Sequence, residues 1–110
     1  MNSTTLSALA EPNRLRIIEL LRDQPYSVGE IANRLALRQP QASKPLRVLS
    51  DAGLVEARHA AQQRIYHLQP KPFEELDSWL ETFRRIWDTR FNKLDKILQE
   101  LKEEQKRDSS

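Results

Sequence analysis

Basic side chains gather in the middle of the chain. Between positions 34 and 64 the basic residues are Arg34, Arg38, Lys44, Arg47, Arg58 and Arg64, and the only acidic ones are Asp51 and Glu56. Guanidinium and ammonium groups at this density attract phosphate oxygens, so the cluster favours a polyanionic partner such as a nucleic acid. A basic surface that only faces water is the alternative interpretation of the same charges.

The basic surplus belongs to the first two thirds of the chain. Residues 1–72 carry ten lysines and arginines against six acids, whereas residues 73–110 carry eight against ten. The chain has no cysteine, which excludes disulfides, thiolate metal sites and thiol-based redox sensing. No run of about 18 apolar residues occurs, and the opening MNSTTLSALAEP does not resemble a signal peptide, so we expect a cytoplasmic protein with no membrane span.

Four short helices are predicted to position the basic residues. Apolar residues recur at helical spacing on both sides of Glu11-Pro12, which separates the first two helices. Ser27 followed by Glu30 has the spacing of a capping box and predicts a third helix over residues 28–35. After a connection at 36–38, Gln39-Pro40 places a proline where the first turn of a fourth helix tolerates it, and Gly53 suits the end of that helix.

The fourth predicted helix has an apolar and a polar face. Ala42, Leu46 and Leu49 share one side, which is therefore expected in the core. The opposite, mostly basic side carries Pro40, Lys44, Arg47 and Asp51.

A β-hairpin is predicted after this helix. Two β-prone runs cover residues 54–58 and 64–68, and residues 59–63 would join them as an exposed polar loop. A capped helix, a short turn, a second helix with a basic face and a hairpin, in this order, match a winged helix-turn-helix. In that fold the second helix fits the major groove of DNA and the hairpin reaches neighbouring phosphates. The predicted fold class is mainly α with a small β-hairpin.

The last segment has the longest apolar pattern of the sequence. Steps of three and four join Leu76, Trp79, Leu80, Phe83, Ile86, Trp87, Phe91, Leu94, Ile97, Leu98 and Leu101. A helix from position 73 to about 104 would be about 48 Å long at about 1.5 Å per residue, longer than a domain of this size can cover. We therefore expect a homodimer, whose interface would comprise Leu76, Trp79, Leu80, Phe83, Trp87, Phe91, Leu94 and Leu98.

This pattern divides the chain into a winged domain over residues 1–72, a dimerisation helix over 73–105 and a frayed tail over 106–110. A helix that lies on a membrane surface is the alternative use of such a stripe. Its polar face would then be expected to carry mainly basic residues, but here both signs of charge are mixed, which favours the dimer.

Several stretches, taken in order, resemble the ArsR/SmtB family of bacterial transcriptional regulators. They are LAEPNRLRIIELL, SVGEIANRL, RQPQASKPLRVLSDAGLVEAR and QQRIYHL, and they lie within about residues 6–68. The long last helix is similar to the family's dimerisation helix. The resemblance implies a homodimeric repressor that binds a palindromic operator in double-stranded DNA and is released by an inducer or a chemical signal.

The resemblance also assigns DNA-binding roles to individual residues. It places Gln39, Gln41, Ser43 and Lys44 in the major groove, where glutamine suits adenine, lysine suits guanine, and serine suits a base or a phosphate. Backbone phosphates would be held by Arg47 and by the wing residues Arg58, Gln63 and Arg64. An ordinary solvated side chain is the alternative at each position.

Pro45 departs from the family pattern, which commonly has a polar residue such as histidine there. Inside a helix a proline removes one hydrogen bond, here to the carbonyl of Gln41, and costs about 3 kcal/mol. Two interpretations stay open. The bend is accommodated near the helix start, or an apolar contact, for example to a thymine methyl group, replaces the usual base contact.

No metal, cofactor or catalytic site is predicted. The last helix offers Asp77, Glu81 and Asp88 but no histidine, and the two histidines, His59 and His67, fall in the hairpin without a third ligand. A glycine-rich phosphate loop and a nucleophile with its base are both missing, so we do not expect an enzyme. Control would come from the protein's own concentration or from an organic effector between the aromatic residues of the last helices.

The sequence thus predicts a DNA-binding transcriptional regulator. The alternative is a protein-interaction module, in which the winged helix is a scaffold and the last helix docks a different chain.

Overall fold

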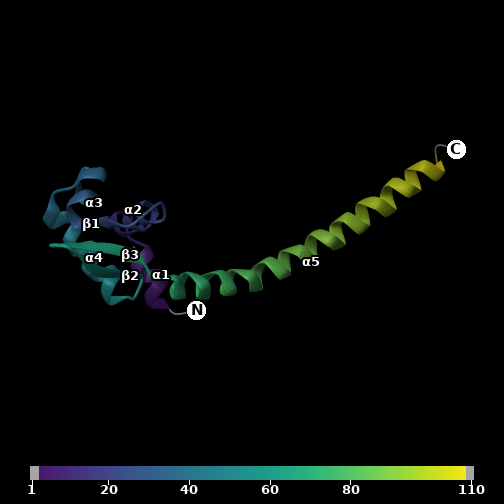
Figure 1. The fold of residues 1–110 in the computed structure, drawn as a ribbon. Coiled ribbons are helices and arrows are strands. Elements are labelled where there is room, and N and C mark those ends of the chain that lie inside the picture. Colours follow the sequence, from purple (N-terminus) through teal and green to yellow (C-terminus); the bar gives the residue numbers. More distant parts are fainter. Residues whose placement is uncertain (1–2, 109–110) are drawn as a thin grey trace. The chain divides into compact units, whose positions relative to one another are not determined.

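The computed structural model describes residues 3–108 and contains five helices and three strands in that range (Figure 1). They are α1 Ser3–Leu9, α2 Pro12–Leu21, β1 Tyr26–Ser27, α3 Val28–Arg34, α4 Gln39–Asp51, β2 Val55–Ala60, β3 Gln63–Leu68 and α5 Pro70–Asp108. The chain forms two compact units, the first ending at Glu75 and the second beginning at Leu76. Within residues 3–108, none of the helices has the length and apolar character needed to cross a membrane.

The start of α3 confirms the capping box. The hydroxyl oxygen of Ser27 accepts a hydrogen bond from the backbone N–H of Glu30 at 3.3 Å, and the Glu30 carboxylate accepts one from the Ser27 N–H at 3.2 Å. The two side chains thereby satisfy two backbone donors that the helix itself leaves without partners. This arrangement fixes where α3 begins relative to the turn that leads into α4.

The core of the first unit confirms the predicted faces of α4. Ala42, Leu46 and Leu49 are completely buried, together with Ile17 of α2 and Ile31 of α3. After α4 the chain turns at Gly53, whose φ of +77° is a conformation that glycine adopts without steric cost. Packing on one side of α4 therefore leaves its polar side exposed.

The hairpin is tighter than the sequence indicated. Residues 59–63 were expected to form a five-residue loop, but β2 and β3 extend through Ala60 and from Gln63, so only Ala61 and Gln62 form the turn. Ala61 has a φ of +57°, a backbone conformation that short hairpin turns need and that glycine or asparagine normally supplies. Since the segment contains neither residue, its sequence carried no signal for a tight turn.

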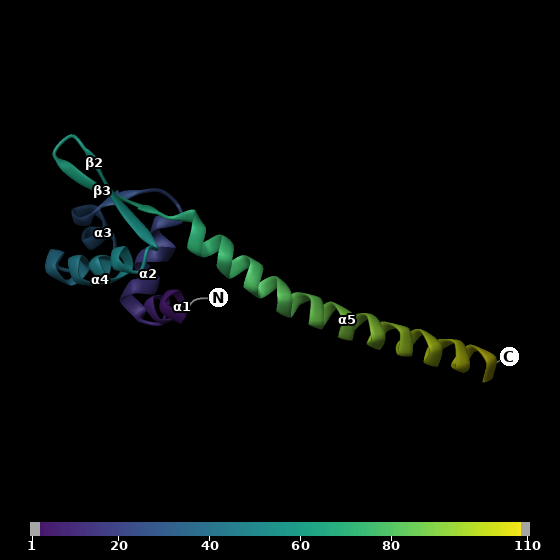
Figure 2. The same ribbon diagram turned by 90° about the horizontal axis from the view of Figure 1, so that it is seen from below.

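A third strand completes the sheet in the order β1-β3-β2. The two residues of β1 pair antiparallel with β3, Tyr26 opposite Tyr66 and Ser27 opposite Ile65. This strand was missed, because two residues carry no alternating pattern. Because β1 pairs only with residues 65 and 66 of β3, the far end of the β2–β3 hairpin extends past β1. Figure 2 shows this hairpin reaching beyond the helices beside it.

Helix α5 begins at Pro70, three residues before the expected start at position 73. Pro70 and Pro72 both fall in its first turn, where the missing N–H of proline breaks no helical bond. Phe73 packs against the core of the first unit. At the other end the helix continues through Asp108, so the tail expected to fray over 106–110 is helical as far as it is described, and Ser109 and Ser110 lie outside the described residues.

Helix α4 continues through Pro45, its seventh residue, up to Asp51. The carbonyl that loses its partner belongs to Gln41, an exposed residue of the first turn, where water can reach it. The helix thus continues past the proline, and the position of any bend and the apolar base contact stay predictions.

Replacing Pro45 by alanine is expected to raise the free energy of unfolding by about 1–3 kcal/mol, because alanine restores the missing donor within the helix. Urea unfolding measures the change. Pro40→Ala is the matched control, since a proline in the first turn breaks no bond, and it should lower stability by less than about 1 kcal/mol. A loss of stability in Pro45→Ala would show that packing of the proline ring outweighs the missing bond.

Candidate nucleic-acid interface

All five candidate base-reading and phosphate-binding residues of α4 are exposed. They are Gln39, Gln41, Ser43, Lys44 and Arg47. Burial of Ala42, Leu46 and Leu49 on the opposite side holds the helix by its apolar face. The five exposed candidates therefore point outward from a rigid helix rather than from a loop. This is the arrangement needed to read base edges.

A hollow between α4 and the hairpin brings distant residues of the candidate site together. It has a volume of about 710 Å³, and its lining includes Ser43 and Arg47 of α4 and Arg64 of β3. The two guanidinium groups outnumber the one carboxylate of the lining, that of Glu56, and each offers several N–H donors to the oxygens of an anion such as phosphate. The sequence placed these residues in one site, and the structure supplies the surface that joins them.

The register of the hairpin separates the three wing candidates. Arg64 lies directly opposite His59, whereas Arg58 lies opposite Ile65 and Gln63 opposite Ala60. Side chains of directly opposed residues point to the same face, and successive residues alternate. Arg64 and His59 therefore share one face of the hairpin, and Arg58 and Gln63 share the other.

His59 is a residue that the sequence reasoning did not include among the DNA contacts. As the strand residue opposite Arg64 it places an imidazole on the same face of the hairpin, although it is not among the residues that line the hollow. Its place opposite Arg64 follows from the pairing register of the hairpin. The sequence prediction put His59 in a loop and therefore gave it no strand partner.

Arg58 has a partner within the hairpin. Its Nε lies 3.4 Å from Oε2 of Glu56, and the side-chain amide of Gln69 donates to the same oxygen at 2.5 Å. The Gln69 hydrogen bond, followed by that of Arg58, lowers the pKa of the Glu56 carboxyl below its usual value. Glu56 thus remains a charged competitor for the Arg58 guanidinium at neutral pH.

Two polar side chains of α4 bond to its own backbone. Oε1 of Gln41 accepts the N–H of Arg38 at 2.8 Å, and the hydroxyl of Ser43 donates to the carbonyl oxygen of Gln39 at 2.9 Å. The first bond satisfies one of the free donors at the start of the helix. Both side chains remain exposed, so each keeps unused hydrogen-bonding groups.

A second hollow, of about 430 Å³, lies between the start of α2 and the face of α4 that carries Gln41 and Lys44. Pro45 and Val48 line it as well. Pro45 is half-buried there, and Val48 is 39% exposed. The apolar side chains of Pro45 and Val48 therefore lie beside the charged side chain of Lys44 on α4.

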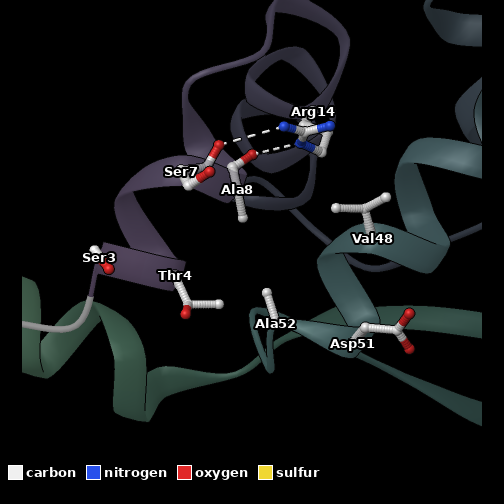
Figure 3. Close-up of a pocket in the computed structure, with 8 residues that line it drawn as sticks. All are labelled: Ser3, Thr4, Ser7, Ala8, Arg14, Val48, Asp51 and Ala52. Atoms are coloured by element: carbon white, nitrogen blue, oxygen red, sulfur yellow. Dashed lines mark hydrogen bonds between the residues drawn. The ribbon is translucent and has the colours of Figure 1, made fainter.

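A third hollow, of about 520 Å³, lies between α1 and the end of α4 (Figure 3). Arg14 lines this hollow, and its guanidinium donates to the carbonyl oxygens of Ala8 at 2.7 Å and Ser7 at 3.3 Å. Both carbonyls lie at the end of α1, where helical bonds run out, and that of Ser7 also accepts the N–H of Ala10 at 3.2 Å. Arg14 thus stabilises the junction of α1 and α2.

The second unit presents a long apolar face. Leu76 and Trp79 are half-buried, while Leu80, Phe83, Trp87, Phe91, Leu94 and Leu98 are between 40% and 58% exposed. Trp79 and Phe83 meet edge to face at 5.1 Å, and the rings of Trp87 and Phe91 are 6.3 Å apart. A continuous face of this size on a helix marks an association surface. Among residues 3–108, no three His, Asp or Glu side chains are grouped so as to hold a metal ion.

Comparison with known proteins agrees with this geometry. Residues 9–58 match a family described as a helix-turn-helix domain. The HTH-type transcriptional regulator Rv2034 of Mycobacterium tuberculosis is 40% identical over 76 residues, which cover 69% of this chain and 71% of that protein. A biofilm growth-associated repressor of Agrobacterium fabrum is 43% identical over 63 residues, 57% of this chain but only about half, 54%, of the repressor.

A solved structure from Mycobacterium bovis is similar over most of the fold. It is a homodimeric winged helix-turn-helix DNA-binding domain, described as a possible ArsR-family transcriptional regulator. The TM-score is 0.63 at 28% identity, and the match covers 74% of this chain and 75% of that one.

Proposed function

Because the chain belongs to the ArsR/SmtB family of winged helix-turn-helix transcriptional regulators, we propose that it is a homodimeric repressor that binds a palindromic operator in double-stranded DNA. The observation that carries the proposal is the exposed face of α4 beside the hairpin, where Ser43, Arg47 and Arg64 line one hollow. An α-helix fits the major groove, and cations beside it hold the flanking phosphates.

The exposed residues divide into two roles. Gln39, Gln41, Ser43 and Lys44 lie toward the start of α4, the part of a recognition helix that contacts base edges. Arg47 and Arg64 hold backbone phosphate from either side of the hollow, with His59 beside Arg64. Arg58 and Gln63, on the other face of the hairpin, make the weaker backbone contacts.

The apolar face of α5 supports the dimer. In the proposed dimer, the apolar face of α5 packs against the same face of a second copy. This contact removes the half-exposed rings of Phe83, Trp87 and Phe91 from water. Two copies then present two α4 helices to DNA, and their two-fold symmetry requires an inverted repeat. Such a regulator acts in the cytoplasm, performs no reaction of its own, and represses by occupying its operator.

The proposal predicts different effects for the two wing arginines. Arg64→Ala should weaken binding to every duplex by a similar factor and make the dependence of affinity on salt shallower by about one phosphate contact per protomer. Arg58→Ala, the matched control, should have a smaller effect, because Glu56 already holds that side chain 3.4 Å away. Gel retardation at several salt concentrations measures both, and equal losses in the two variants would contradict the assignment.

A further inference from the structure

We propose that hydrogen bonds to the backbone at the start of α4 orient two of its base-reading side chains, so that Gln41 approaches DNA with its amide donors and Ser43 with its oxygen lone pairs. This inference rests on the proposed function, because it states which base edges the same surface accepts. It departs from the sequence-based expectation for Gln41, which was pairing with adenine through both its amide oxygen and its amide nitrogen.

The hydrogen bond between Arg38 and Gln41 supports the part of the proposal that concerns Gln41. A glutamine that pairs bidentately with adenine accepts from the N6 amine through Oε1 and donates to N7 through Nε2. Here Oε1 is held at 2.8 Å by the backbone N–H of Arg38, which has no other partner within the helix. Pairing with adenine would require the same oxygen to accept a second hydrogen bond on its one remaining lone pair. The amide nitrogen, in contrast, keeps both hydrogens for an acceptor.

Lys44 reinforces the donor character of this part of α4. It follows Gln41 by three residues, and both line the hollow beside the start of α2. An ammonium group has donors and no acceptor. Guanine is the base whose major-groove edge carries two acceptors, O6 and N7, whereas adenine presents an amine beside N7. Gln41 and Lys44 together therefore favour guanine.

The hydrogen bond between Ser43 and Gln39 supports the part of the proposal that concerns Ser43. The hydroxyl hydrogen of Ser43 is directed to the Gln39 carbonyl oxygen at 2.9 Å, so the oxygen presents lone pairs to solvent. Arg47 and Arg64, which line the hollow on this side, have donors only. The Glu56 carboxylate also lines this hollow, but it is bonded to Gln69 and Arg58. Ser43 is thus the acceptor near the start of α4, and its partner is an exocyclic amine, N4 of cytosine or N6 of adenine.

Selection of bound sequences from a randomised duplex pool tests the proposal. Gln41→Glu keeps an oxygen for the Arg38 N–H, in a turn where a carboxylate is favoured, but has no donor. Pro40→Glu is the matched control, because it adds a carboxylate to the same turn at a residue with no assigned base contact and leaves the Arg38–Gln41 bond intact. We expect the wild type to select guanine at one position per half-site, Gln41→Glu to lose this preference about tenfold, and Pro40→Glu to keep it.

Ser43→Ala should remove the preference for cytosine or adenine at a neighbouring position, and Ser50→Ala, in the same hollow, should leave it unchanged. If the wild type selects adenine at the position that Gln41→Glu alters, Oε1 also accepts from the base and the proposal is wrong, while the proposed function stands. If the wild type selects no sequence at all, the proposed function itself fails.

Discussion

Phe83→Glu combined with Trp87→Glu is expected to turn the dimer into monomers and to weaken operator binding at least a hundredfold. The two rings lie at the centre of the exposed face of α5, where they are 44% and 53% exposed in the single chain. In the dimer each glutamate would be removed from water without a partner, and two-fold symmetry places four such charges in one interface. Breaking a buried contact in this way costs about 3–5 kcal/mol per unpaired charge.

Loss of the dimer affects DNA binding because the two half-sites are bound together. Once one α4 is bound, the second is held close to its half-site, and this raises the overall affinity by orders of magnitude without any new contact. A monomer keeps only the contacts of one half-site. The substitutions lie outside the first unit, so the fold around α4 and the hairpin should be unchanged in circular dichroism.

Thr89→Glu is the control for added charge on α5. Thr89 follows Trp87 by two residues, which places it on the opposite side of the helix, and it is exposed. Sedimentation should give the dimer mass for this variant and the monomer mass for the double variant. A double variant that sediments as a dimer would show that the copies associate through another surface.

Lys44→Ala is expected to lower the affinity for the operator by about 2–6 kcal/mol, because each of the two α4 helices loses a base contact of about 1–3 kcal/mol. Affinity for an unrelated duplex should fall much less, since the lysine is assigned to a base edge rather than to a phosphate. The ratio of the two dissociation constants, measured at one salt concentration, separates these roles.

Lys71→Ala provides the same loss of charge near the end of α4, away from the base-reading residues at its start. Lys71 is an exposed residue of the first turn of α5. This variant should bind both duplexes nearly as well as the wild type. If Lys44→Ala weakens both duplexes by the same factor, Lys44 holds a phosphate, and its role as a base reader is wrong.

The helices of the first unit could be predicted because their signals are local. The spacing of Ala42, Leu46 and Leu49 defines one helical face, and the spacing of Ser27 and Glu30 defines a helix start. The tight turn of the hairpin could not be predicted, because Ala61 adopts a positive φ without the glycine that normally indicates one. Tertiary pairing of the two strands imposes that conformation.

The residue types of the candidate site could be predicted, but not their partners. Helical geometry alone indicates that Lys44 and Arg47 point outward. Two partners depend instead on strand register and side-chain rotamers. Glu56 forms an ion pair with Arg58, and Oε1 of Gln41 accepts a hydrogen bond from the backbone N–H of Arg38. Neither follows from spacing, and both change what the side chains can offer to DNA.

The central claim is that two copies of this chain present two α4 helices to an inverted repeat. Sequencing the fragments that the purified protein selects from a random DNA library tests it most directly. We predict two copies of one short motif in inverted orientation, with centres about 34 Å apart, one turn of the double helix, or a multiple of that spacing. A single unrepeated motif, or a set of fragments with no common sequence, would contradict it.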